Sequence, residues 1–278
     1  MAYVNDKSFS DLQYITADNI HEPKVTAIFA TRNGGVSGQT PETRHLHSLN
    51  LKFDTDGESN ENVSENYKII ASSQGFSLGD VIGLRQGHTD NVLVVDSVAE
   101  QSRTFCLLDE VADAVVTNIK GVLLSVRTAD CVPILLYDNQ NDAIGAIHAG
   151  WRGTIAQIGA KAIRRMTELY GTEPANIKAA IGPAVGVCCY DVDVNFYEKF
   201  RNQFGDRIDK YFVAPHGSKP HCDLKRINEA LLVKAGVQIR NIDVSDLCTA
   251  CNPKLFYSHR ISGEKRGTMA SFIGMKKI

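Results

Sequence analysis

Residues 122–148 read VLLSVRTADCVPILLYDNQNDAIGAIH, and this stretch decides the expected fold. Its apolar, β-branched runs are bounded by turn residues, a pattern that predicts three consecutive strands: Val122–Thr128, Pro133–Asp138 and Ala143–His148. Four similar runs lie earlier in the chain: Val25–Thr31, Val81–Arg85, Asn91–Asp96 and Ala114–Asn118. Helical periodicity is confined to three segments: Thr154–Tyr170, Val192–Phe204 and Leu224–Ala235. Because strands outnumber helices and cluster together, the sequence favours a mixed α/β, α+β-like sheet protein over a doubly wound parallel fold.

Local signals mark two of the helix ends and one long loop. Gly171 follows the first helical segment at the C-cap position, and Asp223 is a good N-cap for the last one. The segment Asn33–Asn66 is rich in Gly, Ser, Thr, Asn and Asp, so we expect a long loop there. Long loops in compact chains are often functional.

The composition excludes several classes of protein. The 278 residues have 43% hydrophobic and 22% charged content and a net charge of −2, which argues against a surface for nucleic acid or anionic membrane. The first ten residues lack the pattern of a signal peptide, and no apolar run approaches the ~18 residues of a membrane span. We therefore expect one domain over residues 1–278, with residues 1–24 as an N-terminal extension, in the cytoplasm. The seven cysteines are then reduced.

Two motifs at strand ends carry the chemistry expected of this chain. The usual nucleotide-binding and hydrolase motifs are absent, but TADC ends at Cys131 and HAGWRGT begins at His148. A Cys and a His on neighbouring strand ends form either a nucleophile–base pair or part of a zinc or copper site. The plain alternative is a buried thiol and a hydrogen-bonded core histidine.

A second histidine is a candidate third member of this group. His88, in Gln86-Gly87-His88, follows another expected strand. Two imidazoles and one thiolate leave the fourth position of a tetrahedral zinc open, which is typical of a catalytic site. The sequence gaps are too long for spacing alone to establish the grouping, and an exposed loop histidine is the alternative.

Four segments together resemble the YfiH, or laccase-domain (multi-copper polyphenol oxidase-like), family: RTADCV (127–132), IGAIHAGWRGT (144–154), IGPAVGVCCYDV (181–192) and DLCTACNPKLFYSHR (246–260). The resemblance runs from about Phe29 to Ile273. It implies that His88, Cys131 and His148 are the metal ligands and catalytic residues. It also implies an α/β fold in which sheets are sandwiched between helices, similar to that of a cytotoxic-factor deamidase.

The resemblance further implies an enzyme of the purine nucleoside phosphorylase type. Such an enzyme phosphorolyses adenosine, inosine and methylthioadenosine with phosphate as co-substrate, and deaminates adenosine, using zinc, with copper as the alternative metal. Its partner is then a small nucleoside, without nucleic acid or membrane. Three alternatives stay open: a copper-dependent polyphenol oxidase, a Cys/His amidase acting on a cell-wall precursor, and a metal-binding protein without turnover. The sequence does not fix the oligomeric state.

Other polar residues are candidates for substrate binding. Arg32, Arg152 and Arg260 are cations suited to hold phosphate, and Asn50 lies in Ser48-Leu49-Asn50-Leu51, which resembles a family motif. Each has an alternative as a surface or solvated residue. Cys248-x-x-Cys251 is half of a typical zinc site without a visible second half, whereas adjacent Cys188 and Cys189 are expected to point apart.

The sequence departs from the family pattern at two places. Thr89 replaces the usual glycine after the first ligand histidine, and the stretch after Phe53 differs from the usual Gly-Asp. The first departure leaves the expected ligand His88 intact. The second weakens any transfer of residue roles between Asp54 and Glu65.

Overall fold

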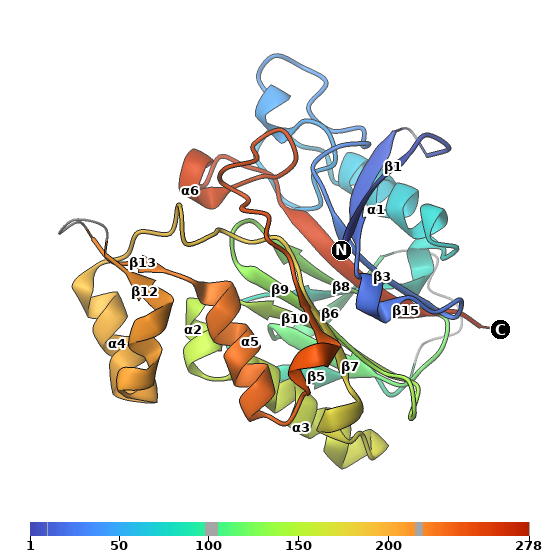
Figure 1. Ribbon diagram of the computed structural model, residues 1–278. Helices are drawn as coiled ribbons and strands as arrows, with labels where there is room; N and C mark the ends of the chain where they lie inside the picture. The colour runs from blue at the N-terminus through green and yellow to red at the C-terminus, as the bar shows by residue number, and fades with distance from the viewer. Residues whose placement is uncertain (10, 98–104, 215–218, 278) are drawn as a thin grey trace.

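The computed structural model describes residues 1–9, 11–97, 105–214 and 219–277. Two large sheets dominate it (Figure 1). The seven-stranded sheet has the order β1 (Ala2–Asp6), β2 (Leu12–Thr16), β3 (Val25–Ala30), β15 (Met269–Met275), β8 (Val122–Thr128), β4 (Val81–Arg85) and β6 (Cys106–Val111). The six-stranded sheet has the order β14 (Ile242–Val244), β11 (Lys178–Ile181), β9 (Val132–Asp138), β10 (Ala143–Ala149), β7 (Ala114–Thr117) and β5 (Val92–Val94).

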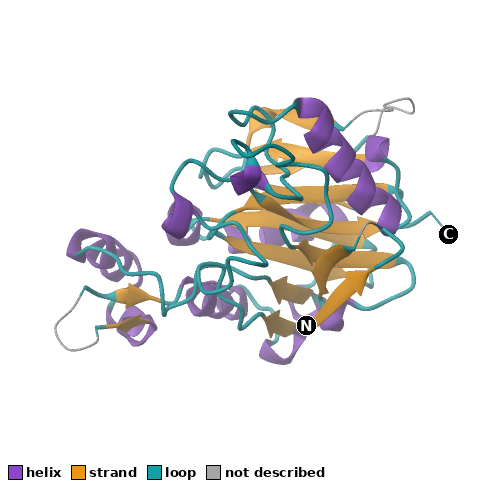
Figure 2. Cartoon of the chain, turned by 90° about the horizontal axis from the view of Figure 1, so that it is seen from above, coloured by secondary structure: helices purple, strands orange, loops and turns teal. Residues whose placement is uncertain are grey.

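Helix α1 (Asn60–Ser73) covers the outer face of the seven-stranded sheet, and α2 (Trp151–Ile155), α3 (Ile158–Tyr170) and α5 (Leu224–Lys234) lie on the outer face of the six-stranded sheet. Two further helices, α4 (Val194–Phe204) and α6 (His259–Ser262), lie outside these layers. Short 3-10 turns connect the elements: Asp18–Ile20, Arg44–Leu46, Leu78–Asp80, Pro174–Asn176, Asp206–Tyr211 and Ile239–Asn241. A two-stranded sheet, β12 (Phe212–Val213) and β13 (His221–Cys222), lies with α4 at one side of the molecule (Figures 1 and 2). Among the described helices, none has the length and apolarity needed to cross a membrane.

The layers follow from the alternation of side chains along the strands. In β8, Val122, Leu124 and Val126 point into the core between the two sheets, whereas Leu123 joins the layer beneath α1. In β10, Ile144 and Ala146 face the same central core, and Ile147 packs beneath α3 and α5. Because both sheets are apolar on both faces, each needs a helical layer outside it. The result is the expected mixed α/β fold with sheets between helices.

Most predicted strands agree with the structure. Val81–Arg85 and Val122–Thr128 match β4 and β8 at both ends, and Asp223 caps α5 by accepting a hydrogen bond from the Arg226 amide. The helix expected over Thr154–Tyr170 is instead two helices, because Gln157 adopts a left-handed conformation with φ of 59°. Gly171 ends α3 as expected, with φ of 71°.

The expectation for the polar segment needs correction. The end of Asn33–Asn66 is not loop, because α1 begins at Asn60 with Ser59 as its N-cap. Its sequence is mostly polar, but Val63, Tyr67, Ile70 and Ala71 recur on one buried face. The expected N-terminal extension, residues 1–24, forms β1 and β2 of the seven-stranded sheet.

The chain passes repeatedly between the two sheets. Strands β4, β6 and β8 are parallel neighbours in the seven-stranded sheet, so their carboxyl ends lie at one edge. Each is followed directly by a strand of the other sheet: β5, β7 and β9 respectively. Three crossing segments therefore meet at that edge, and they contain His88, Asp113 and Cys131.

Candidate metal centre

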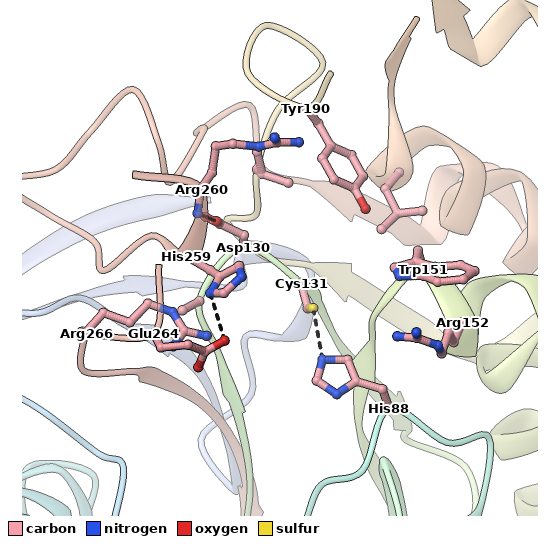
Figure 3. A pocket seen from close by; sticks show the side chains of 13 residues that line it. His88, Asp130, Cys131, Trp151, Arg152, Tyr190, His259, Arg260, Glu264 and Arg266 are labelled. Carbon is pink, nitrogen blue, oxygen red and sulfur yellow. Dashed lines mark hydrogen bonds and ion pairs between the residues drawn. The ribbon is translucent and has the colours of Figure 1, made fainter. Parts of the chain in front are cut away.

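His88, Cys131 and His148 converge where the crossing segments meet. His88 follows β4, Cys131 links β8 to β9, and His148 is near the end of β10. One ligand atom from each lies within 4.8 Å of the others, and His88 Nε2 is 3.9 Å from Cys131 Sγ (Figure 3). The histidine rings are edge to face, with centroids 5.0 Å apart. The three residues expected to act together are thus neighbours in the fold.

Asp113 orients two members of this trio. Its side chain is fully buried, and its Oδ1 lies 2.7 Å from His148 Nδ1. The same carboxylate accepts hydrogen bonds from the amides of Gly87, His88 and Thr89, and from the Thr89 hydroxyl. With Nδ1–H donating to this carboxylate, Nε2 is the nitrogen of the neutral His148 ring that presents a lone pair toward Cys131 and His88. The loop carrying His88 and the ring of His148 are therefore fixed by one carboxylate.

The trio is a strongly coupled set of charges. Burial raises the pKa of the Asp113 carboxyl, but the His148 ring and Thr89 outweigh it and bring the pKa to about 2. Burial also raises the pKa of the Cys131 thiol, but His148 and His88 lower it to about 6. Burial lowers the pKa of His148, but Cys131 and Asp113 raise it to about 9. In the metal-free protein a thiolate therefore faces an imidazolium near neutral pH.

The donor set and the space between the donors fit a metal ion. A thiolate and two imidazoles suit zinc and copper alike. Gly150 borders this space, and a Cβ added there would lie 3.0 Å from His88 Cδ2 and 3.3 Å from Cys131 Sγ. A larger residue at this position would occupy the space between the ligands. The open space beside Gly150 and the hydrogen bond between His148 and Asp113 both fit a metal centre.

The backbone beside the trio adopts conformations that are rare for side-chain-bearing residues. His88 has φ of 57° and Asp130 has φ of 89°. Asp130 is held in place by Thr249 Oγ1 at 2.5 Å, Ser258 Oγ at 3.0 Å and the Arg260 amide at 2.6 Å. Such conformations persist only where surrounding contacts enforce them, and they concentrate at functional sites.

Two open cavities meet at the trio. One of about 490 Å³ is lined on its walls by aromatic and charged side chains: Trp151, Arg152, Tyr190, His259, Arg260 and Glu264. The other, of about 640 Å³, carries further cations: Lys52, Arg85 and Arg127. Both cavities include His88, Cys131 and Arg266. Figure 3 shows Cys131 and His88 at the centre of the first cavity, with the charged side chains around them.

The structure brings only some of the expected substrate residues to these cavities. Arg152 and Arg260 line the first cavity. Arg32 lines neither; its guanidinium donates to the carbonyl oxygens of His45, His47 and Pro253. Asn50 is fully buried, and its Oδ1 accepts hydrogen bonds from the amides of Lys52 and Thr268. Both residues hold loop backbone in place, and neither lines the cavities at the trio.

Several residues of the site were missed from the sequence. Asp113 gave a weak signal, as a single carboxylate between alanines at the start of an apolar strand. Arg266 and Glu264 had no signal of their own, because they reach the cavity only through the fold, whereas Tyr190 lies in one of the family-like segments, IGPAVGVCCYDV. Thr89, noted as a departure from the family pattern, donates twice to Asp113 and so supports the metal centre.

Comparison with known proteins identifies the family. The sequence model of the family described as multi-copper polyphenol oxidoreductase laccase matches residues 26–276. The chain belongs to this family. It is 35% identical to purine nucleoside phosphorylase YlmD of Bacillus subtilis, over 93% of this chain and 91% of that protein. It is 33% identical to adenosine deaminase RL5 of an unknown prokaryotic organism, over 86% and 90%.

Solved structures of the same family share the fold. The Bacillus licheniformis hypothetical protein YfiH superposes with a TM-score of 0.85 and 35% identity, covering 99% of both chains. YlmD of Geobacillus stearothermophilus superposes with a TM-score of 0.83 and 29% identity, covering 96% of both. The resemblance and the fold class expected from the sequence are confirmed.

Proposed function

We propose that this protein is a purine nucleoside metalloenzyme. With phosphate as co-substrate, it splits adenosine, inosine and methylthioadenosine into the free base and the sugar 1-phosphate, and it also deaminates adenosine. The observation that carries the proposal is the convergence of His88, Cys131 and His148 where two arginine-bearing cavities meet. The names of the two relatives, a purine nucleoside phosphorylase and an adenosine deaminase, supply the substrate class.

The first cavity has the size and chemistry that a nucleoside and phosphate need. Its volume of about 490 Å³ lies within the range of small-molecule sites. Trp151 and Tyr190 offer rings against which a purine base stacks. Arg152, Arg260 and Arg266 offer guanidinium groups that bind phosphate oxygens in pairs.

In phosphorolysis these side chains act on the sugar and the phosphate. A phosphate oxygen bonds to the anomeric carbon C1′ as the C1′–N9 bond breaks, and the base leaves with the bonding electrons and takes up a proton. The guanidinium groups hold the phosphate against the sugar, where positive charge develops in the transition state. Because the guanidinium groups are already held on the cavity wall, they need not reorient during the reaction, as water molecules would.

Deamination exchanges the amino group of adenine for an oxygen from water, and ammonia leaves. A zinc ion held by His88, Cys131 and His148 would supply a Lewis acid that lowers the pKa of a bound water to about 7. Asp113 keeps His148 in the tautomer whose Nε2 faces the ion. Copper suits the same donors, so the identity of the metal is part of the test.

One observation favours a second candidate, a Cys/His amidase. The pKa of Cys131 is brought to about 6 by its histidine neighbours despite burial, and an unmetallated thiolate of this kind is a nucleophile. In that reaction the thiolate attacks an amide carbonyl, and His148 gives its proton to the leaving amine. The resulting thioester is then hydrolysed by water.

The deciding experiment measures turnover of adenosine, inosine and methylthioadenosine, with and without phosphate, on protein of known metal content. We expect activity that disappears in His88→Ala, Cys131→Ala and His148→Ala, and that survives in Cys106→Ala, a cysteine in β6 outside the trio. Metal-loaded protein that leaves all three nucleosides unchanged would exclude the proposal. Amide hydrolysis that survives chelation but not thiol alkylation would establish the amidase instead.

The proposal also places the enzyme in the cytoplasm. Cys131 must remain reduced to act as a ligand, and a reducing compartment maintains such thiols. Localisation of the tagged chain in cell fractions tests this point.

A further inference from the structure

Four cysteines outside the trio form a second cluster. Cys188 and Cys189 come from the loop after β11, and Cys248 and Cys251 come from the loop after β14. Their sulfur atoms all lie within 4.8 Å of one another. Cys251 Sγ is 3.5 Å from Cys188 Sγ and 3.3 Å from Cys189 Sγ. The missing second half of the Cys248-x-x-Cys251 motif is therefore the adjacent pair, which was expected to point apart.

We propose that Cys188, Cys189, Cys248 and Cys251 bind a structural zinc ion, separate from the ion of the His88–Cys131–His148 centre. Tetrahedral zinc with Zn–S bonds of about 2.3 Å places its sulfurs about 3.8 Å apart. The measured separations are close to this value and far longer than the roughly 2.05 Å of a disulfide bond. Four thiolates are a closed ligand set, which is typical of structural sites.

A tight turn explains how two adjacent cysteines face the same point. The Cys189 amide donates to the Gly186 carbonyl at 2.9 Å, which folds residues 186–189 back on themselves. Gly186 suits this close approach, because an added Cβ would lie 3.1 Å from Cys248 Cβ and 3.2 Å from Cys188 Sγ, and these neighbours would have to move apart. In an extended segment neighbouring side chains point to opposite sides. In this turn, both Cys188 and Cys189 place their sulfurs near Cys251.

Backbone amides point at the sulfur that is most deeply buried. The Gly186 amide donates to Cys248 Sγ at 3.2 Å, and the Cys251 amide also donates to it. N–H groups aimed at a sulfur stabilise it as a thiolate, the form that binds metal. At this cluster backbone amides hold a ligand sulfur, as the Asp113 carboxylate holds the ligand His148 at the other centre.

A buried cation lies beside the cluster. Lys225 is 7% exposed, and its ammonium donates to the carbonyl oxygens of Ser245 and Leu247, directly before Cys248 in the chain. Zinc binding by four thiols releases four protons and leaves a net charge of −2 on the cluster. The ammonium of Lys225 offsets part of that charge. Cys188 and Cys251 are exposed, so the ion reaches the sulfurs from solvent.

The ion would join two loops that form a wall of the first cavity. Tyr190 and Val185, on the first loop, line the cavity. Thr249, on the second loop, bonds through its amide to Ala184 and through its hydroxyl to Asp130. Asp130 directly precedes Cys131. The four-cysteine zinc therefore stabilises the wall beside the metal centre without touching it.

The experiment counts zinc in protein purified without chelator under reducing conditions. We expect two zinc ions per wild-type chain and one in the double variant Cys248→Ser/Cys251→Ser. The reciprocal double variant Cys131→Ala/His148→Ala is expected to keep one. Replacing the zinc of this second variant by cobalt is expected to give the intense thiolate-to-cobalt absorption of a tetrahedral sulfur site. Cys106→Ala is the matched control and is expected to keep both ions.

Two results would overturn the proposal. One is equal zinc content in the wild type and in Cys248→Ser/Cys251→Ser. The other is a disulfide among these four cysteines in reduced, zinc-loaded protein, detected by mass spectrometry. If the double variant does not fold, Cys131→Ala/His148→Ala decides the question: a mercurial thiol reagent is expected to release one zinc ion from it, whereas release of none contradicts the proposal. Because the two centres share no residue, loss of nucleoside activity does not bear on this outcome.

Discussion

At the scale of single residues, Asp113 has the largest expected influence on the metal centre. Its Oδ1 faces His148 Nδ1 and the His88 amide, and its Oδ2 accepts from the amides of Gly87 and Thr89. An amide side chain cannot replace it. If the Asn Nδ2 faced His148, it would donate to Nδ1, so the neutral ring would carry its proton on Nε2 and have no lone pair there for the metal. If Nδ2 faced the other way, its N–H groups would oppose the amide N–H groups of Gly87 and Thr89.

Asp113→Asn is therefore expected to weaken zinc binding at the trio by about 10- to 100-fold. Competition with a chelator of known affinity measures the change. Asp138→Asn is the matched control, since Asp138 is equally buried and also accepts from backbone amides, at Gln140 and Asn141. Equal zinc affinity in Asp113→Asn and wild type would show that the carboxylate does not orient the ligand.

The sequence identified ligand candidates better than it identified their environment. His88, Cys131 and His148 lie in specific motifs, so residue types and family resemblance together selected them. Asp113 and Arg266 act through positions that only the fold creates; the local pattern marks Asp113 weakly and Arg266 not at all. Conversely, Arg32 and Asn50 are residue types suited to bind substrate, but their side chains form hydrogen bonds with the backbone of nearby loops. Which polar side chain faces a cavity depends on contacts distant in sequence.

At the scale of secondary-structure elements, buried strands were predictable and peripheral elements were not. β4 and β8 are apolar on both faces and bounded by turn residues, so their limits follow from the sequence. β1 is mostly exposed and gains its order by pairing with β2, which leaves little local signal. The break between α2 and α3 follows from one left-handed residue, Gln157, within an otherwise continuous helical pattern.

The N-cap of α5 provides a test at this scale. The Asp223 carboxylate accepts from the Arg226 amide at 3.1 Å, which satisfies one of the free amides of the first turn. Asp223→Ala is expected to lower the free energy of unfolding by about 1 kcal/mol in urea denaturation. Asp223→Ser retains a capping oxygen and is expected to keep most of that stability. If both variants lost the same unfolding free energy, the loss would have a cause other than the missing N-cap hydrogen bond.

At the scale of the whole molecule, the candidate metal centre lies between the two sheets. His88 and Cys131 lie on crossing segments between the seven-stranded and six-stranded sheets, and His148 belongs to a strand of the second. An ion bound by all three therefore favours the folded arrangement of the complete sandwich. If zinc binds the folded state and not the unfolded state, it raises the free energy of unfolding by RT ln(1 + [Zn]/Kd).

This stabilisation by zinc is expected to depend on pH in a definite direction. The folded, metal-free pair is a Cys131 thiolate with a pKa of about 6 and a His148 imidazolium with a pKa of about 9. In the unfolded chain the proton is on the thiol and the ring is neutral between about pH 6.5 and 8.5. Both states then bind one proton, so this pair makes the metal-free stability nearly independent of pH in that range.

Zinc binding, in contrast, must remove the proton from His148. The affinity of the trio for zinc is therefore expected to rise about tenfold per pH unit from pH 6.5 to 8, and the zinc-dependent gain in unfolding free energy by about 1.4 kcal/mol per unit. Urea denaturation of Cys248→Ser/Cys251→Ser at fixed free zinc measures this, because that variant lacks the four-cysteine site. His148→Ala in the same background is the control and should lose the pH-dependent gain. A gain that stays constant from pH 6.5 to 8 would mean that His148 is already neutral in the metal-free protein, and that the thiolate–imidazolium pair does not form.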